Sequence, residues 1–89
     1  MSITVSFPAL FSERIGGVES VDLEGDTVEA TLRALTERYT ELGSLVWKSL
    51  NLNPVLAVFL NGRQLKSGDL YVKVRAGDEI TILSALEGG

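Results

Sequence analysis

Residues 25–43 spell GDTVEATLRALTERYTELG and predict the one long helix of this chain. Asp26 can accept a hydrogen bond from the first backbone N–H groups, and Glu29 three residues later completes a capping box. Gly43 stands where a helix C-cap belongs. Between these ends, apolar side chains recur every three or four residues and share one helical face. They are Val28, Leu32, Leu35, Tyr39 and Leu42.

Two strand patterns precede the helix. Ile3–Phe7 alternates apolar and polar residues, as a half-buried strand does, and Pro8 ends it. Gly16-Gly17 is a break before Val18–Leu23, which predicts a second strand. We expect the two strands to form an antiparallel hairpin with a long loop.

Further strand patterns follow the helix. Leu45–Leu50 predicts a short helical turn that brings Trp47 against one end of the core. Val55–Leu60 is an unbroken apolar run, which is typical of a central strand. Asn61-Gly62 is the sequence of a type I′ turn, so the chain should fold back after it. Ile80–Leu83 predicts the last strand.

This order of elements predicts an α+β fold. One amphipathic helix covers one face of one mixed sheet, and the helix supplies the crossover that lets the first and last strands pair in parallel at the centre. The expected architecture is the β-grasp, or ubiquitin-like, fold, with a mixed sheet of four to five strands packed on one main helix. Residues 1–84 should form this domain, and residues 85–89 a flexible C-terminal tail.

The composition excludes several kinds of function. The 89 residues include no cysteine and no histidine, so thiol nucleophiles, Ser-His-Asp catalysis and thiolate or imidazole metal sites are absent. A net charge of −4 does not suit a nucleic-acid partner. No apolar run approaches the roughly 20 residues of a membrane span, and the N-terminus lacks a signal-peptide pattern. We expect a cytoplasmic protein that is not an enzyme, with no catalytic or metal-binding residues and no membrane partner.

The C-terminal sequence carries the clearest functional signal. It runs Ser84-Ala85-Leu86-Glu87-Gly88-Gly89. Two glycines have no side chains and few backbone restrictions, so they can enter a narrow channel. The Gly89 carboxylate is an acyl group that reacts once it is activated. The alternative is an inert, frayed terminus, because chain ends are commonly small and disordered.

Several segments occur in an order that resembles a known family. They are ITVSFP at 3–8, GG at 16–17, GDT at 25–27, NG at 61–62, GDEITIL at 77–83 and the final Gly-Gly. With these segments the chain resembles the ThiS/MoaD/CysO family of ubiquitin-like sulfur-carrier proteins, and most of all its CysO members. Glu87 is a departure, because relatives often carry alanine there.

The resemblance implies a mechanism that lies with partner proteins. An E1-like enzyme would use ATP and Mg²⁺ to adenylate Gly89, and sulfur would then displace AMP and leave a thiocarboxylate. A downstream synthase would accept that sulfur for cysteine, molybdopterin, thiamin or a secondary metabolite. The carrier itself would bind no cofactor, and Leu86, Glu87 and Gly88 would be recognised as its tail. Two alternatives remain: a protein modifier conjugated through Gly89, and an interaction domain with an inert tail.

Phe59 is a candidate contact for the partner. It lies in the run Val55–Leu60, of which only alternate residues can face the helix. An exposed apolar patch is commonly covered by a partner. The alternative is that Phe59 is buried under residues 63–74.

Overall fold

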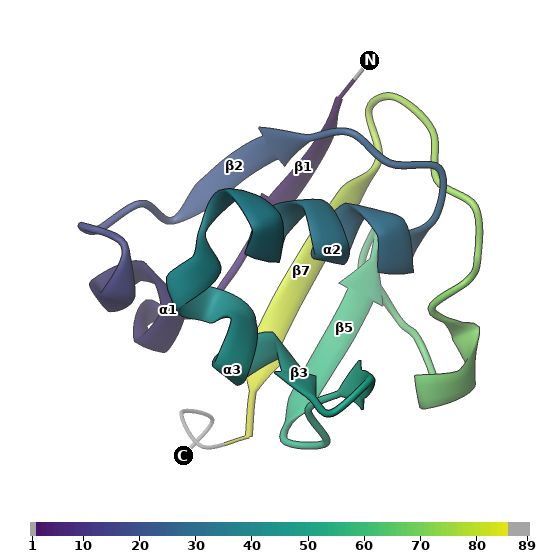
Figure 1. The fold of residues 1–89 in the computed structure, drawn as a ribbon. Helices are drawn as coiled ribbons and strands as arrows, with labels where there is room; N and C mark the ends of the chain where they lie inside the picture. The colour runs from purple at the N-terminus through teal and green to yellow at the C-terminus, as the bar shows by residue number, and fades with distance from the viewer. Residues whose placement is uncertain (1, 86–89) are drawn as a thin grey trace.

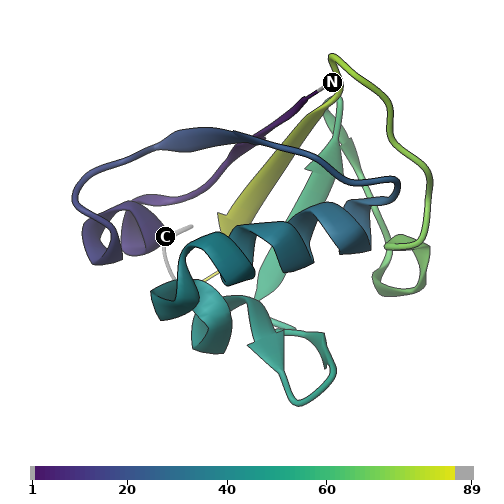
Figure 2. The ribbon, with the colours of Figure 1, turned by 45° about the horizontal axis from the view of Figure 1, so that its top comes forward.

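The computed structural model describes residues 2–85. The main sheet has five strands. Figure 1 shows the sheet with helices on one face, and Figure 2 shows the same two layers from a second direction. The helical elements are α1 (Ala9–Arg14), α2 (Val28–Arg38), η1 (Thr40–Leu42), α3 (Gly43–Val46) and η2 (Ser67–Asp69). The strands are β1 (Ile3–Ser6), β2 (Ser20–Leu23), β3 (Trp47–Lys48), β4 (Asn51–Leu52), β5 (Leu56–Leu60), β6 (Arg63–Gln64) and β7 (Glu79–Ser84).

The sheet has the topology that the sequence predicts. Its strand order is β2-β1-β7-β5-β6, and β3 and β4 form a separate hairpin. The first and last strands, β1 and β7, pair in parallel at the centre, with Val5 opposite Ile80. All the other strand pairs are antiparallel. The α+β β-grasp prediction is confirmed.

The core lies between the sheet and α2. Strands β1, β5 and β7 each bury every second residue, and the buried side chains face the helix. Helix α2 contributes the apolar stripe that the spacing predicts, with Val28, Leu32 and Leu35 fully buried. Tyr39, the next residue of that stripe, is only partly buried.

The ends of α2 differ from the prediction. The N-cap is Thr27, whose hydroxyl accepts a hydrogen bond from the backbone N–H of Ala30 at 3.0 Å. The predicted Asp26–Glu29 capping box is therefore wrong. The first two backbone N–H groups of α2 donate to carbonyls of a distant segment. Val28 N–H donates to Val72 O at 3.1 Å, and Glu29 N–H donates to Leu70 O at 2.8 Å.

The predicted C-cap at Gly43 is also wrong. Helix α2 ends at Arg38, and the chain continues through η1 into the short helix α3, which begins at Gly43. Gly43 has ordinary helical dihedral angles, φ −55° and ψ −46°, rather than the left-handed conformation of a glycine cap. The apolar spacing continues to Leu42 because the chain keeps winding after the α-helical hydrogen bonds stop.

Two smaller features depart from the prediction as well. The loop after Pro8 contains helix α1, whose Phe11 is fully buried and stacks on Phe7 with ring centroids 6.1 Å apart. The predicted helical turn at Leu45–Leu50 ends at Val46, and Trp47 begins strand β3. Trp47 still packs against the core, as expected, and its indole N–H donates to Thr36 Oγ1 at 3.1 Å.

The turn after β5 is confirmed. Asn61 and Gly62 have φ angles of 51° and 84°, the two positive values of a type I′ turn, and β6 folds back on β5. The Asn61 side chain also accepts from the backbone N–H of Glu79 at 2.8 Å and donates to Asp78 Oδ1 at 3.1 Å. The turn is thereby joined to the start of β7.

Candidate functional site

The site begins where the chain leaves the sheet. Ser84, the last residue of β7, lies opposite Leu56, the first residue of β5. The next residue, Ala85, is exposed, and its backbone N–H donates to Val55 O at 2.9 Å. The tail therefore departs beside the start of β5. Leu86, Glu87, Gly88 and Gly89 lie outside the described residues, so their predicted roles stay predictions.

The sheet face that points away from α2 carries an apolar patch next to this exit. On β5, Ala57 and Phe59 alternate with the buried core residues and so lie on the outer face. On β7, Leu83 lies on the same face directly opposite Ala57, and 48% of it is exposed. We call Ala57, Phe59 and Leu83 the outer-face patch.

Phe59 lies on the face that the sequence argument assigned to a partner. It is partly buried, with Thr81 of β7 on one side and Gln64 of β6 on the other. Neither neighbour is apolar. Leu83 lies two residues after Thr81 on β7, so Phe59 and Leu83 are diagonal neighbours across the strand pair. Its role in docking stays a prediction.

Leu83 is a candidate that the sequence argument did not single out. The signal was present, because the alternation of β7 buries Ile80 and Ile82 and leaves Leu83 on the other face. An exposed leucine two residues from the tail is well placed to contact any enzyme that holds the tail.

The remainder of the outer face is polar. Ser6 Oγ donates to Thr81 Oγ1 at 3.4 Å, and Thr4 Oγ1 donates to Asp22 Oδ1 at 3.0 Å. Within the patch, Ala57 and Leu83 form the strand pair nearer the tail exit, and Phe59 lies two residues farther along β5. The outer-face patch therefore begins beside the point where the tail leaves the sheet.

Acidic groups and helices of the described residues were the remaining candidates for a metal site or a membrane span. Between residues 2 and 85, no three acidic, histidine or cysteine side chains gather in a group that could hold a metal ion. The pKa of Asp78 is lowered from its ordinary value of 3.8 by the backbone N–H of Arg75 and by the Asn61 amide. Asp78 lies before β7, at the end of that strand opposite the tail. None of the described helices is both long and apolar enough to cross a membrane.

Comparison with known families decides what kind of protein carries this tail and patch. The model of the ThiS family matches residues 5–89, which is nearly the whole chain and includes Gly89. The chain belongs to the ThiS family. The resemblance predicted from the sequence is confirmed.

Relatives of this ThiS-family chain extend over its full length. It is 30% identical over 93 residues to the sulfur carrier protein CysO of Mycobacterium tuberculosis, covering 100% of both chains. Among solved structures, it matches a chain of the Amycolatopsis orientalis BexX/CysO complex with a TM-score of 0.86 and 32% identity, covering 98% of this chain and 99% of that one. It also matches SAMP1, a small archaeal modifier protein of Haloferax volcanii, with a TM-score of 0.85, 27% identity and complete coverage of both chains.

Proposed function

We propose that this protein is a sulfur carrier whose Gly89 carboxylate becomes a thiocarboxylate. The observation that carries the proposal is the family match, which runs through the final Gly-Gly and agrees with a full-length relative that is a sulfur carrier. The position of the outer-face patch supports the proposal, because an apolar surface beside the tail can form the contact with a partner enzyme.

The chemistry takes place on a partner. The Gly89 carboxylate attacks the α-phosphorus of ATP, pyrophosphate leaves, and a mixed acyl-phosphate anhydride remains. Hydrosulfide-level sulfur then adds to the acyl carbon and expels AMP, which leaves the thiocarboxylate. An E1-like enzyme supplies the nucleotide site and Mg²⁺, and a downstream synthase takes the sulfur. This chain contributes the acyl terminus and the docking surface, as a carrier rather than a catalyst.

The experiment uses the cognate activating enzyme with ATP and measures pyrophosphate release and the intact mass of the carrier. The native chain should release pyrophosphate and gain the mass of one sulfur in place of one oxygen. A chain extended by one residue beyond Gly89 should do neither, because the carboxylate is displaced from the α-phosphorus and displacements of about 1 Å can cost about 100-fold in rate. Equal activity of an extended chain that stays intact by mass would overturn the proposal.

Conjugation to other proteins is the second candidate. The likeness to SAMP1 favours it, because that relative is named a modifier and shares the fold over its full length. Both functions use an activated Gly89, so they differ in the acceptor. Isopeptide-linked adducts of this chain on lysines of cellular proteins would favour the modifier. Replacement of oxygen by sulfur without such adducts would favour the carrier.

A further inference from the structure

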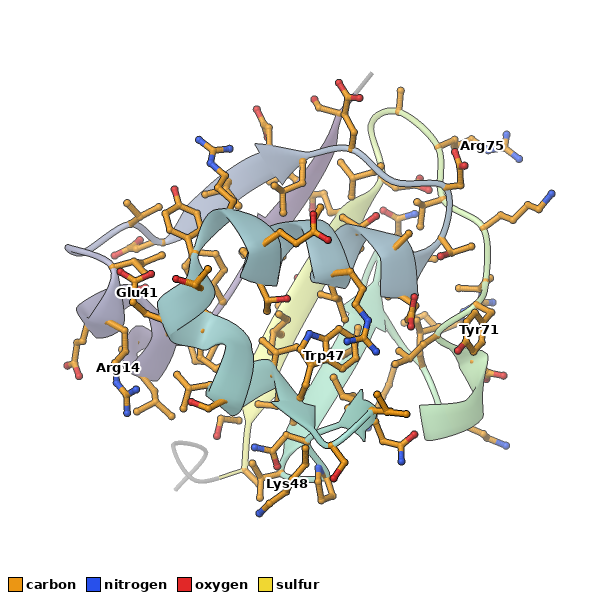
Figure 3. All side chains as sticks on the ribbon, viewed as in Figure 1. Arg14, Glu41, Trp47, Lys48, Tyr71 and Arg75 are labelled. Atoms are coloured by element: carbon orange, nitrogen blue, oxygen red, sulfur yellow. The ribbon has the colours of Figure 1, made fainter. Side chains whose placement is uncertain are left out.

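A second apolar surface is formed by exposed side chains other than those of the outer-face patch. Of the four large apolar side chains that are exposed between residues 2 and 85, only Leu83 belongs to the outer-face patch. The other three are Leu50, Tyr71 and Val72, which are 82%, 72% and 36% exposed. With Arg63 and Lys66 they form what we call the lateral surface. In Figure 3, Tyr71 lies at the margin of the molecule beyond Trp47.

The lateral surface is hollowed. A groove of about 290 Å³ lies between the β3–β4 hairpin and the segment that begins with η2. Leu50 and Tyr71 lie on its walls, and Trp47, Leu52 and Leu70 also line it. Its polar lining is Asn51 and Glu29, and the Glu29 carboxylate is paired with Arg33. A second hollow of about 410 Å³ shares Tyr71 with the first and extends to Arg63 and Lys66 beside the edge strand β6. Tyr71 therefore lies between a largely apolar groove and a hollow with two cations.

Both walls of the groove are held in place by the fold. Leu50 lies at the hairpin tip, and its carbonyl accepts a hydrogen bond from Arg33 Nη2 at 3.1 Å. Tyr71 lies between Leu70 and Val72, whose carbonyls accept the two backbone N–H groups at the start of α2. Because its neighbours are fixed and Leu70 is buried, Tyr71 is held with its ring in solvent. The backbone of both walls is therefore ordered before a partner binds, which lowers the entropy cost of binding.

The charge of this region differs from that of the rest of the chain. Residues 63–75 contain four of the eight basic residues and one of the twelve acidic residues, a local charge of +3 in a chain of net charge −4. Arg75 lines a separate hollow with Glu24 and Asp26, which offset it. Arg63 and Lys66 have one acidic neighbour in their hollow, Asp69, and form no ion pair within residues 2–85.

We propose that the lateral surface binds an acidic segment of a partner protein, with an apolar side chain of that segment in the groove between Leu50 and Tyr71 and its carboxylates facing Arg63 and Lys66. The unpaired cations select an acidic occupant, and opposite charge across an interface speeds association and excludes wrong partners. The lateral surface centres on Tyr71 and meets the outer-face patch at a hollow that Lys66 shares with Ala57. The inference rests on the proposed function only in assuming that partner proteins exist.

The test uses the full chain labelled with ¹⁵N and a synthetic peptide of alternating glutamate and leucine. A peptide with lysine in place of each glutamate is its matched control. Backbone amide shifts should change in residues 47–52 and 63–72 with the acidic peptide only, and added NaCl should weaken the effect. Arg63→Glu with Lys66→Glu should weaken binding about tenfold, because two ion pairs become repulsive. Arg14→Glu with Arg38→Glu, on α1 and α2, should leave it unchanged.

Two further variants separate this surface from the other one. Tyr71→Ala should weaken peptide binding, whereas Leu83→Asp, on β7, should not. Shift changes centred on Phe59 and Leu83, equal binding of the lysine peptide, or shifts in residues 63–72 that grow with protein concentration alone would overturn the proposal. The last result would assign the surface to a second copy of this chain. No activating enzyme takes part, so failure here leaves the carrier proposal standing.

Discussion

The guanidinium carbon of Arg33 lies 3.7 Å from the ring centroid of Trp47. Arg33 extends from α2, whereas Trp47 begins the β3–β4 hairpin. The same guanidinium donates to Glu29 Oε2 at 3.3 Å on its own helix and to Leu50 O at 3.1 Å on the hairpin. The Arg33 side chain thus joins the hairpin to α2 and fixes one wall of the groove between Leu50 and Tyr71.

Arg33→Ala should therefore loosen the hairpin and lower the free energy of unfolding by about 1 kcal/mol, because a cation–π contact at a partly exposed site contributes about 0.5–1 kcal/mol and a helical ion pair adds a few tenths. Trp47 is the only tryptophan, so its emission reports on this contact during urea unfolding. Arg38→Ala is the control, because it removes an arginine of the same helix whose guanidinium lies 5.5 Å from the ring of its neighbour Tyr39 and not against Trp47. Equal losses in the two variants would contradict the bracing role.

The start of α2 gives a second prediction. Thr27→Ala removes the acceptor of the 3.0 Å hydrogen bond from the Ala30 N–H and should cost about 1 kcal/mol of stability. Asp26→Ala should cost much less, because Asp26 is not the N-cap. Thermal unfolding of the two variants compares them directly. A larger loss for Asp26→Ala would restore the capping box that the sequence suggests.

Asp78 predicts a dependence of stability on pH. Its pKa is lowered in the folded state, chiefly by the Arg75 backbone N–H at 2.9 Å, so the folded protein favours the ionised carboxylate. The stabilisation is complete above the ordinary value of 3.8 and is lost as the pH falls below it through the lowered folded-state pKa. At about pH 7 the unfolding midpoint of the native protein should be higher than that of Asp78→Asn. The difference between the two midpoints should disappear toward about pH 2.

The comparison needs a carboxylate on another part of the surface. Glu13→Gln, on the exposed side of α1, is the matched carboxylate-to-amide control. An Asp78→Asn gap that stays constant down to the lowest pH would show that the Asn61–Asp78 contact stabilises the fold through shape rather than charge.

The outer-face patch gives a prediction about partner binding. Phe59→Asp and Leu83→Asp should each weaken binding of the activating enzyme at least about tenfold, because a charge replaces an apolar contact at the centre of an interface. Both side chains point away from the core, so the unfolding midpoint should change little. Titration calorimetry with the activating enzyme gives the affinity, and circular dichroism gives the fold.

Ser20→Asp is the matched control for the patch. It places the same charge on the outer face but on β2, at the opposite edge of the sheet. Its affinity should equal that of the native chain. Unfolding of Phe59→Asp would return Phe59 to the core, and in that case Leu83→Asp, whose side chain is 48% exposed, still tests the patch.

Local patterns in the sequence were enough for the sheet and for the main helix. Alternation over Ile3–Phe7 and Ile80–Leu83, the stripe along α2 and the Asn61-Gly62 turn each depend on neighbours a few residues away, so they predict strands, helix and turn directly. The topology then follows from the helix, which lies in the chain between the β1–β2 hairpin and the later strands. This crossover lets β1 and β7 pair in parallel at the centre of the sheet. The family, too, followed from the order of these segments.

Contacts between distant residues decided the rest. Asp26 and Thr27 are both residue types that favour the N-cap position. In the folded chain Thr27 is the N-cap, and the carbonyls of Leu70 and Val72 accept hydrogen bonds from the first N–H groups of α2. Those same bonds hold Tyr71 outward, which no local pattern indicates. Leu83 became part of a patch only when β7 placed it opposite Ala57. Local spacing sets which face a residue takes, whereas only the folded chain sets what lies next to it.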